Sequence, residues 1–186
     1  MNDPSICIGC GLCCNGTLHG RTTVRPDDER NVVAAGLTIE EQGPKRFFRQ
    51  PCPRFSCGSC SIYAQRPQVC RTYRCALLKK LESGKISESE ARERIATAKR
   101  LIAIVQSLDP SAITPGERTD LARRLRHELS RASETSRESI ARNLLDVGAL
   151  EHFLNSWFLS KEDADTSAKT AWADFQEGGA AAGSSS

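Results

Sequence analysis

Nine cysteines are the residues of this 186-residue chain whose type and spacing point most clearly to chemistry. All of them lie between Cys7 and Cys75, and the rest of the chain has none. Cysteine thiolates bind zinc and iron–sulfur clusters, form disulfides, and act as redox or nucleophilic groups. We therefore expect the chemistry of this protein in its first 75 residues.

The first cluster has the pattern Cys-x2-Cys-x2-Cys-Cys and consists of Cys7, Cys10, Cys13 and Cys14. Two-residue spacers let thiolates converge on one metal, and Gly9 and Gly11 give the backbone the freedom to curl around it. Because adjacent side chains usually diverge, we expect one of the last two cysteines to join the first two. The other then faces a second metal or the second cysteine segment. A strained disulfide between the adjacent pair is the less favoured alternative.

A disulfide scaffold is the main alternative interpretation of so many cysteines. Residues 1–5 contain neither the basic region nor the apolar region of an export signal, so a reducing cytoplasm is the expected compartment. The number of cysteines is odd, and two-residue spacers suit a chelate better than separate bridges. These features favour metal binding over disulfides.

The second cysteine segment consists of Cys52, Cys57, Cys60, Cys70 and Cys75. A Cys-x2-Cys-x2-Cys run completed by a remote Cys-Pro, here Cys52-Pro53, is similar to the ferredoxin-type arrangement that holds a [4Fe–4S] cluster. The usual three-residue final spacing is absent, however, and the excess of cysteines over four would equally suit two tetrahedral zinc sites. Zinc and iron both remain open, with a slight preference for an iron–sulfur cluster.

Taken together, CxxCxxCC, a later CP and then CxIYxxRPxxCRxYxC resemble the YkgJ family of cysteine-cluster proteins, also called CxxCxxCC proteins. The resemblance covers about residues 5–80 and implies a zinc- or iron-chelating domain. Some relatives that modify flagellin lysines carry this pattern beside an iron–sulfur cluster, so an enzyme role is the alternative. The resemblance also implies that the metal ligands are the eight cysteines of the family pattern, which are Cys7, Cys10, Cys13, Cys14, Cys52, Cys60, Cys70 and Cys75.

Cys57 lies outside the family pattern and is interpreted as a spare ligand, a regulatory or redox partner of Cys60, or an idle thiol. His19 lies between the two cysteine segments and is expected at the surface, while His127 and His152 fall in regions expected to be helical. With eight thiolates available, we expect none of the three histidines to bind metal.

Residues 45–80 contain no acidic residue and nine basic ones, namely Lys45, Arg46, Arg49, Arg54, Arg66, Arg71, Arg74, Lys79 and Lys80. A nucleic-acid surface is one interpretation, but aromatic side chains for base stacking make up only 5% of the chain. Compensation of thiolate charge is favoured, since eight thiolates carry more charge than two divalent ions neutralise. We expect Arg66, Arg71 and Arg74 to donate N–H groups to the sulfurs.

Residues 1–80 are expected to form an irregular, loop-rich cysteine-cluster metal-binding domain. One helix is predicted there, beginning near Pro26 with acidic residues in its first turn and ending at Gly36. A short strand is predicted from His19 to Val24. Bound metal, rather than apolar burial alone, is expected to organise this part of the chain.

Residues 81–162 are expected to be helical. A capping box beginning at Ser87 opens one helix that ends before Asp109, and Thr114, followed by Pro115, opens a second. Apolar residues at helical spacing continue from there to Gly148.

A last helix is predicted within Leu150 to Leu159, packed on the other two, and residues 163–186 are predicted to be a flexible tail that ends in Gly, Ala and Ser. The predicted fold class is mainly α, with the loop-rich cysteine-cluster domain packed with a C-terminal helical part.

The composition argues against a membrane-spanning protein, because the mean hydropathy is −0.42 and no apolar run approaches the roughly 18 residues that a bilayer crossing needs. The favoured function is a metal-chelating cysteine-cluster protein in an accessory or non-catalytic role, with a metal ion and a protein partner or substrate. The alternative is an iron–sulfur-dependent redox or protein- or peptide-modifying enzyme. Nucleic-acid binding ranks last.

Overall fold

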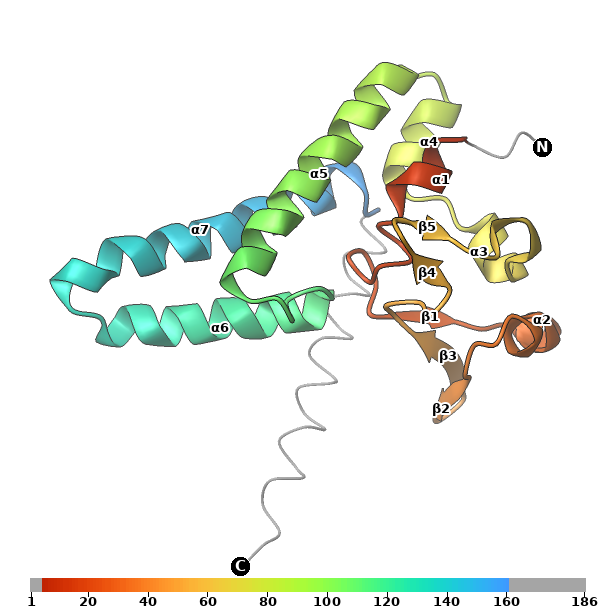
Figure 1. Ribbon diagram of the computed structural model, residues 1–186, viewed down its shortest axis with the longest axis horizontal. Helices are drawn as coiled ribbons and strands as arrows, with labels where there is room; N and C mark the ends of the chain where they lie inside the picture. Colours follow the sequence, from red (N-terminus) through yellow and green to blue (C-terminus); the bar gives the residue numbers. More distant parts are fainter. Residues whose placement is uncertain (1–4, 161–186) are drawn as a thin grey trace, which may run out of the picture. The chain divides into compact units, whose positions relative to one another are not determined.

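The computed structural model describes residues 5–160, which form seven α-helices and five short strands (Figure 1). The mainly α fold class, with a loop-rich N-terminal region and a helical C-terminal region, is confirmed. The chain divides into two compact units between Ala96 and Thr97, a boundary that falls inside α5 (Glu88–Leu108). We call them the N-terminal unit and the C-terminal unit and describe each by itself.

Short helices carry much of the N-terminal unit, namely α1 (Ser5–Cys10), α2 (Glu29–Ala34), α3 (Gln68–Thr72) and α4 (Ala76–Glu82). The predicted helix is confirmed as a 3-10 turn over Pro26–Asp28 followed by α2, which ends before Gly36 at φ +69°. The expectation that it is the only helix there is wrong. The other three run for five to seven residues, too few for an apolar period to be recognised.

Two small antiparallel sheets complete this unit. The larger has the strand order β1-β3-β2, formed by β1 (Arg21–Thr23), β2 (Glu40–Gln42) and β3 (Lys45–Arg49) (Figure 1). A tight hairpin forms the other, from β4 (Phe55–Ser56) and β5 (Ser59–Cys60). The strand predicted from His19 to Val24 is confirmed as β1. The remaining four were not predicted, because strands this short take their stability from their neighbours.

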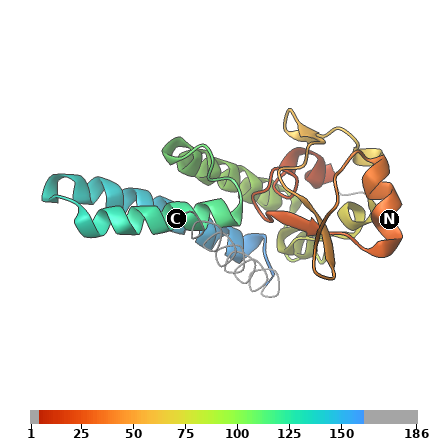
Figure 2. The same cartoon turned by 90° about the horizontal axis from the view of Figure 1, so that it is seen from below.

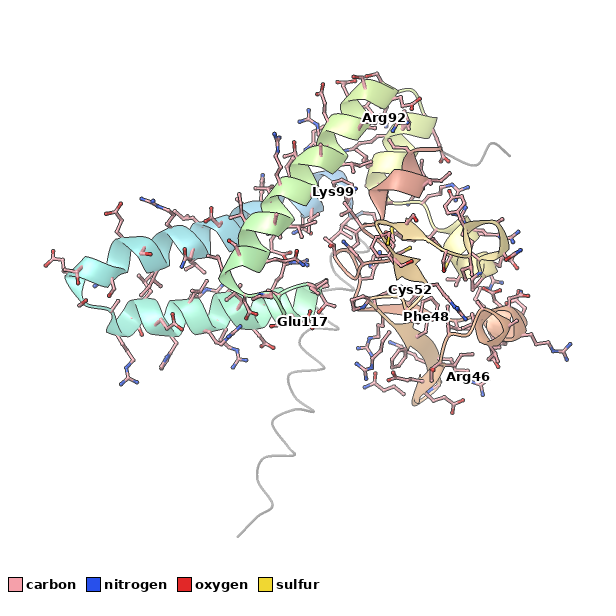
Figure 3. The ribbon with its side chains drawn as sticks, viewed as in Figure 1. Arg46, Phe48, Cys52, Arg92, Lys99 and Glu117 are labelled. Carbon is pink, nitrogen blue, oxygen red and sulfur yellow. The ribbon has the colours of Figure 1, made fainter. Side chains whose placement is uncertain are left out.

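A small apolar cluster lies beside the larger sheet and consists of Val24, Val32, Ala35, Leu37 and Phe48. Two cysteines, Cys52 and Cys70, are half-buried against it. Figure 3 labels Phe48 and Cys52 in this region. Packing against this cluster therefore helps to fix the positions of two cysteines that are predicted to bind metal.

In the C-terminal unit, α6 (Pro115–Arg131) and α7 (Glu134–Trp157) lie side by side as a helical hairpin, as both Figure 1 and Figure 2 show. The predicted start of α6 is confirmed. Thr114 Oγ1 accepts a hydrogen bond from the Glu117 N–H at 3.4 Å, while Glu117 Oε2 accepts one from the Thr114 N–H at 2.7 Å. The Ser87–Glu90 capping box that opens α5 is confirmed in the same way.

The last helix differs from the prediction. A single helix, α7, runs from Glu134 through Gly148 to Trp157, where two segments separated at the glycine were expected. Glycine inside a helix costs about 1 kcal/mol relative to alanine. Val147 and Leu150, which are 2% and 1% exposed, flank the glycine with buried side chains that offset this cost.

The predicted tail, residues 163–186, lies outside the described residues. Within residues 5–160, no helix combines the length and apolar character that crossing a bilayer requires.

An ion pair between the buried Arg118 and the more exposed Glu151 links the two helices of the hairpin. The Arg118 side chain, 2% exposed, donates hydrogen bonds to Glu151 and to the Ile113 carbonyl. We expect Glu151→Gln to lower the free energy of unfolding by about 1–3 kcal/mol, since it weakens a charged partner of a buried guanidinium. Urea unfolding followed by circular dichroism measures this. Glu138→Gln, which alters an exposed pair with Arg142, is the control and should cost less than about 0.5 kcal/mol.

Candidate metal centre

The fold brings the two cysteine segments together. Cys7 and Cys10 lie on α1, and Cys13 and Cys14 follow it in a turn. The Cys52 N–H donates to the Cys14 carbonyl at 2.7 Å, which joins the two segments through the backbone. The other cysteines of the family pattern come from β5, α3 and the first residue before α4, and are Cys60, Cys70 and Cys75.

A first set of thiols surrounds Cys13. Burial raises the pKa of the Cys13 thiol well above its ordinary value, and the neighbouring thiols raise it further, with Cys75 and Cys10 the strongest. Cys75 also caps α4, because its Sγ accepts a hydrogen bond from the Leu78 N–H at 3.5 Å. Cys14 and Cys7 also raise the pKa of Cys13. We assign Cys7, Cys10, Cys13 and Cys75 to a first thiol group, and leave Cys14 out because Cys60 and Cys52 act on it more strongly than Cys7 does.

A second set surrounds Cys14. Burial raises the pKa of Cys14 to about 12, and the thiols of Cys60, Cys52 and, less strongly, Cys7 raise it further. Burial likewise raises the pKa of Cys70 to about 12, with further increases from Cys14, Cys52 and Cys60. We call this set the second thiol group; its members are Cys14, Cys52, Cys60 and Cys70.

The turn after α1 sends the adjacent cysteines toward different groups. The Gly11 carbonyl accepts hydrogen bonds from the N–H groups of Cys14 at 3.0 Å and Asn15 at 2.9 Å, and Gly11 itself has φ +74°. The Cys13 thiol lies with the first group, whereas the Cys14 thiol is influenced most by Cys60 and Cys52. The different leading influences on the two thiols fit the expected divergence, which stays a prediction.

We expect Gly11→Ala to disrupt this turn. An added Cβ would lie 2.5 Å from Phe55 Cζ, and the positive φ is itself unfavourable for alanine, by about 1–2 kcal/mol. Urea unfolding of the metal-free protein should show a loss larger than this conformational cost alone. Gly9→Ala is the matched control, because nothing lies within 4 Å of its added Cβ. Equal stability of the two variants would contradict the prediction.

Of the three arginines predicted near the sulfurs, Arg66 acts on the second thiol group. Its guanidinium lies 3.8 Å from the centroid of the Tyr63 ring, and its charge lowers the pKa of Cys14 and Cys70 against the opposing effect of burial. Arg71 donates to the carbonyls of Arg66 and Ala64 at 2.8 and 2.7 Å, which braces the backbone around Arg66.

Arg74, the third of these arginines, contacts Glu82 at 3.0 Å and donates to the Arg71 carbonyl. Direct donation from Arg66, Arg71 or Arg74 to sulfur stays a prediction.

Other basic residues of the 45–80 stretch have acidic partners from outside it. Arg46 pairs with Glu29 and Glu41, and Arg49 pairs with Glu40 at 2.8 Å. These pairs could not be inferred from the composition of residues 45–80, because each carboxylate belongs to an element earlier in the chain. These pairs reduce the positive charge available to a nucleic acid or to the thiolates.

Sequence reasoning missed one contact near the thiols. His19 Nε2 lies 2.7 Å from the Tyr73 hydroxyl, and the two rings meet edge to face with centroids 5.1 Å apart. His19 is half-buried, not at the surface as expected. Tyr73 lies between Cys70 and Cys75 in the CRxYxC motif, and this position in the sequence could have indicated a role near the thiols.

Cys57, the cysteine outside the family pattern, is exposed at the tip of the β4–β5 hairpin. Its φ is +48° and that of the following Gly58 is +79°, as a two-residue hairpin turn with two left-handed positions requires. Its exposure distinguishes it from the eight half-buried cysteines of the family pattern.

The donor set suits a thiophilic metal, although its geometry is not that of a bound ion. Among residues 5–160, no three or more cysteine, histidine or carboxylate side chains stand in an arrangement ready to hold a metal. None of the nine cysteines, all of which lie within residues 5–160, forms a disulfide, and each thiol group offers four sulfurs, the number that zinc and a [4Fe–4S] cluster both take. Binding would require the thiols to rotate inward and lose their protons.

Residues 6–97 match the CxxCxxCC family, described as a "putative zinc- or iron-chelating domain". This match confirms the family resemblance that the cysteine motifs predicted. No curated protein and no solved structure matches the chain.

Proposed function

We propose that the protein chelates zinc or iron with the eight cysteines of the family pattern, in an accessory or non-catalytic role. The observation that carries this proposal is that the fold brings the two cysteine segments together, with the Cys52 N–H hydrogen-bonded to the Cys14 carbonyl at 2.7 Å. The thiols raise one another's pKa across the two segments, and we assign them to two groups of four. Thiolates near one another in a buried environment repel each other, and a bound cation relieves that repulsion.

In this proposal each thiol group holds one metal centre. The first would use Cys7, Cys10, Cys13 and Cys75, and the second Cys14, Cys52, Cys60 and Cys70. A four-thiolate set would supply either a tetrahedral zinc site or the ligands of an iron–sulfur cluster. Arg66 would offset part of the negative charge of the second centre, since its charge already favours thiolates there.

The accessory role follows from the number of ligands. A metal closed by four protein thiolates keeps no coordination position for a substrate, which is typical of structural sites and unlike catalytic zinc. We therefore propose that the centres fold the N-terminal unit and present its surface to a protein partner. A reducing compartment, the cytoplasm, is the proposed location, because it would keep the nine thiols available for metal.

The second candidate is an iron–sulfur-dependent redox or protein-modifying enzyme. The Cys-x2-Cys-x2-Cys run with the remote Cys52-Pro53 favours it, since this arrangement is similar to that of ferredoxins. A closed cluster can still transfer electrons, so four-cysteine ligation does not conflict with this role.

The test is metal analysis, with a visible spectrum, of protein purified without oxygen. Two zinc ions per chain and no colour support the zinc form, whereas iron, sulfide and broad visible absorption support iron–sulfur centres. Replacing Cys10 and Cys75 with Ser should remove one centre, and replacing Cys52 and Cys70 should remove the other. Cys57→Ser is the control and should keep both. Loss of all metal in either double variant would indicate one shared centre, and wild-type protein without metal would refute the proposal.

A further inference from the structure

A buried carboxylate outside both thiol groups connects two elements of the N-terminal unit. Asp28, at the end of the 3-10 turn before α2, is 1% exposed. Its Oδ1 accepts hydrogen bonds from the Gln68 N–H at 3.0 Å and from Asn31 Nδ2 at 2.9 Å, and its Oδ2 accepts one from the Val69 N–H at 2.8 Å. Both carboxylate oxygens are therefore used, and two of the donors belong to α3.

These hydrogen bonds fix a helix that cannot hold its position alone. Helix α3 has five residues, about the length of its nucleating turn, and isolated helices this short are unstable in water. Its first N–H groups have no acceptors within the helix, so acceptors must come from elsewhere in the chain. The Asp28 carboxylate, 40 residues earlier in the chain, accepts hydrogen bonds from two of these N–H groups.

The same short helix carries one of the proposed ligands. Cys70 lies directly after Val69, whose N–H donates to Asp28, and both residues are half-buried against the apolar cluster that contains Val32. The apolar contact holds one side of α3, and the two hydrogen bonds hold its first turn. The position of the Cys70 sulfur relative to Cys14 therefore depends on Asp28.

The charge of Asp28 adds to this restraint. Burial alone would raise the pKa of its carboxyl group, but the hydrogen bonds from Val69, Asn31 and Gln68, together with the charge of Arg71, outweigh burial and lower it. The group is thus a carboxylate at neutral pH, and hydrogen bonds to a charged acceptor are stronger than neutral ones.

We propose that Asp28 is a positioning residue for the second thiol group, which sets the metal affinity of that centre by holding α3 without touching the metal. This inference rests on the proposed metal-chelating function. It distinguishes the two centres, because Asp28 anchors the element that carries Cys70, whereas the first group takes its cysteines from α1, the turn after it and the start of α4.

The experiment measures zinc affinity by competition with a chelator, using full-length protein in two backgrounds. Cys10→Ser with Cys75→Ser leaves only the second thiol group intact, and Cys52→Ser with Cys70→Ser leaves only the first. Asp28→Asn, which replaces one accepting oxygen with a donor, should weaken zinc binding about 10- to 100-fold in the first background. It should change binding less than about twofold in the other.

A cobalt spectrum gives a second measurement that a loss of stability alone would not alter. In the background that keeps only the second thiol group, cobalt bound by four thiolates should show charge-transfer and d–d bands. Asp28→Asn in the same background should shift or weaken these bands at saturating cobalt. Asp120→Asn, at an exposed carboxylate that pairs with Arg123 on α6, is the matched control and should alter neither spectrum nor affinity.

A milder variant covers the case in which Asp28→Asn does not fold. Asn31→Ala removes a single donor to Asp28 and should weaken the second centre about two- to fivefold, with no change in the first. Equal weakening of both centres, or unchanged affinity in the second, would overturn the role of Asp28. If neither background binds zinc or cobalt before Asp28 is altered, the proposed function fails, and this inference fails with it.

Discussion

Removal of the bound metal is expected to unfold the N-terminal unit while α6 and α7 stay helical. The N-terminal unit consists of short helices and strands around a small apolar cluster, and structural zinc binds zinc-finger peptides with about 10–16 kcal/mol, which becomes folding free energy. The α6–α7 hairpin has its own buried side chains, such as Leu125, Leu150 and Leu154. Its stability therefore does not depend on the cysteines.

Hydrogen exchange with mass spectrometry, before and after addition of a strong chelator, measures this difference. Peptides from residues 5–82 should lose protection, and peptides from 115–157 should keep it. Restoring zinc should restore protection, which shows that the loss is not oxidation of the thiols. Protection that persists in residues 5–82 without metal would mean that apolar burial alone holds this unit together.

Metal affinity is expected to rise steeply with pH between about pH 6 and 9. The pKa of Cys14 and of Cys70 is about 12 in the absence of metal, and the pKa of Cys13 is raised as well, so these thiols are protonated at neutral pH. A metal that binds four of them must displace about four protons, which makes the apparent affinity of each centre depend strongly on pH. Zinc competition titrations across this range measure the slope, and a slope near zero would contradict thiol ligation.

The stability of the metal-free protein is expected to change in the opposite direction. A thiol whose folded pKa lies above its unfolded value near 9 stabilises the fold fully below pH 9, and this contribution is lost as the pH rises toward 12. Metal-free protein should therefore lose stability above about pH 9. The zinc-bound form should lose less, because its ligands are already deprotonated. Cys57→Ser changes an exposed residue and should not alter the dependence of stability on pH in either the metal-free or the zinc-bound form.

The elements that could be predicted from the sequence are those with local signals. Thr114 with Glu117, and Ser87 with Glu90, mark the starts of α6 and α5, because capping boxes act within four residues. Four of the five strands lack such signals; β3, for example, is stabilised by β1 and β2 from elsewhere in the chain. Helix α7 continues through Gly148 because the burial of neighbouring side chains outweighs the low helix propensity of glycine. A rule based on local sequence does not include this burial.

The composition of the candidate site comes from the sequence, and its role as a metal centre stays a prediction, whereas the grouping of its thiols depends on the fold. The spacing of Cys7, Cys10 and Cys13 places these residues together, because a two-residue spacer acts locally. That Cys75 accompanies them, while Cys14 lies with Cys60 and Cys70, depends on how β5, α3 and α4 are placed. No spacing rule reaches across such distances in the chain.

The crossing of the two cysteine segments affects how this protein would mature during its synthesis. Each thiol group draws members from both ends of the N-terminal unit, so neither proposed centre is complete until the ribosome has released the segment from Cys70 to Cys75. The two centres then become available almost together. A metal ion bound in one centre closes a loop of the chain that contains most of the cysteines of the other centre. The first ion to bind therefore reduces the loss of loop entropy that opposes binding of the second ion. A chain that stops short of Cys70 would emerge with only partial sites for metal.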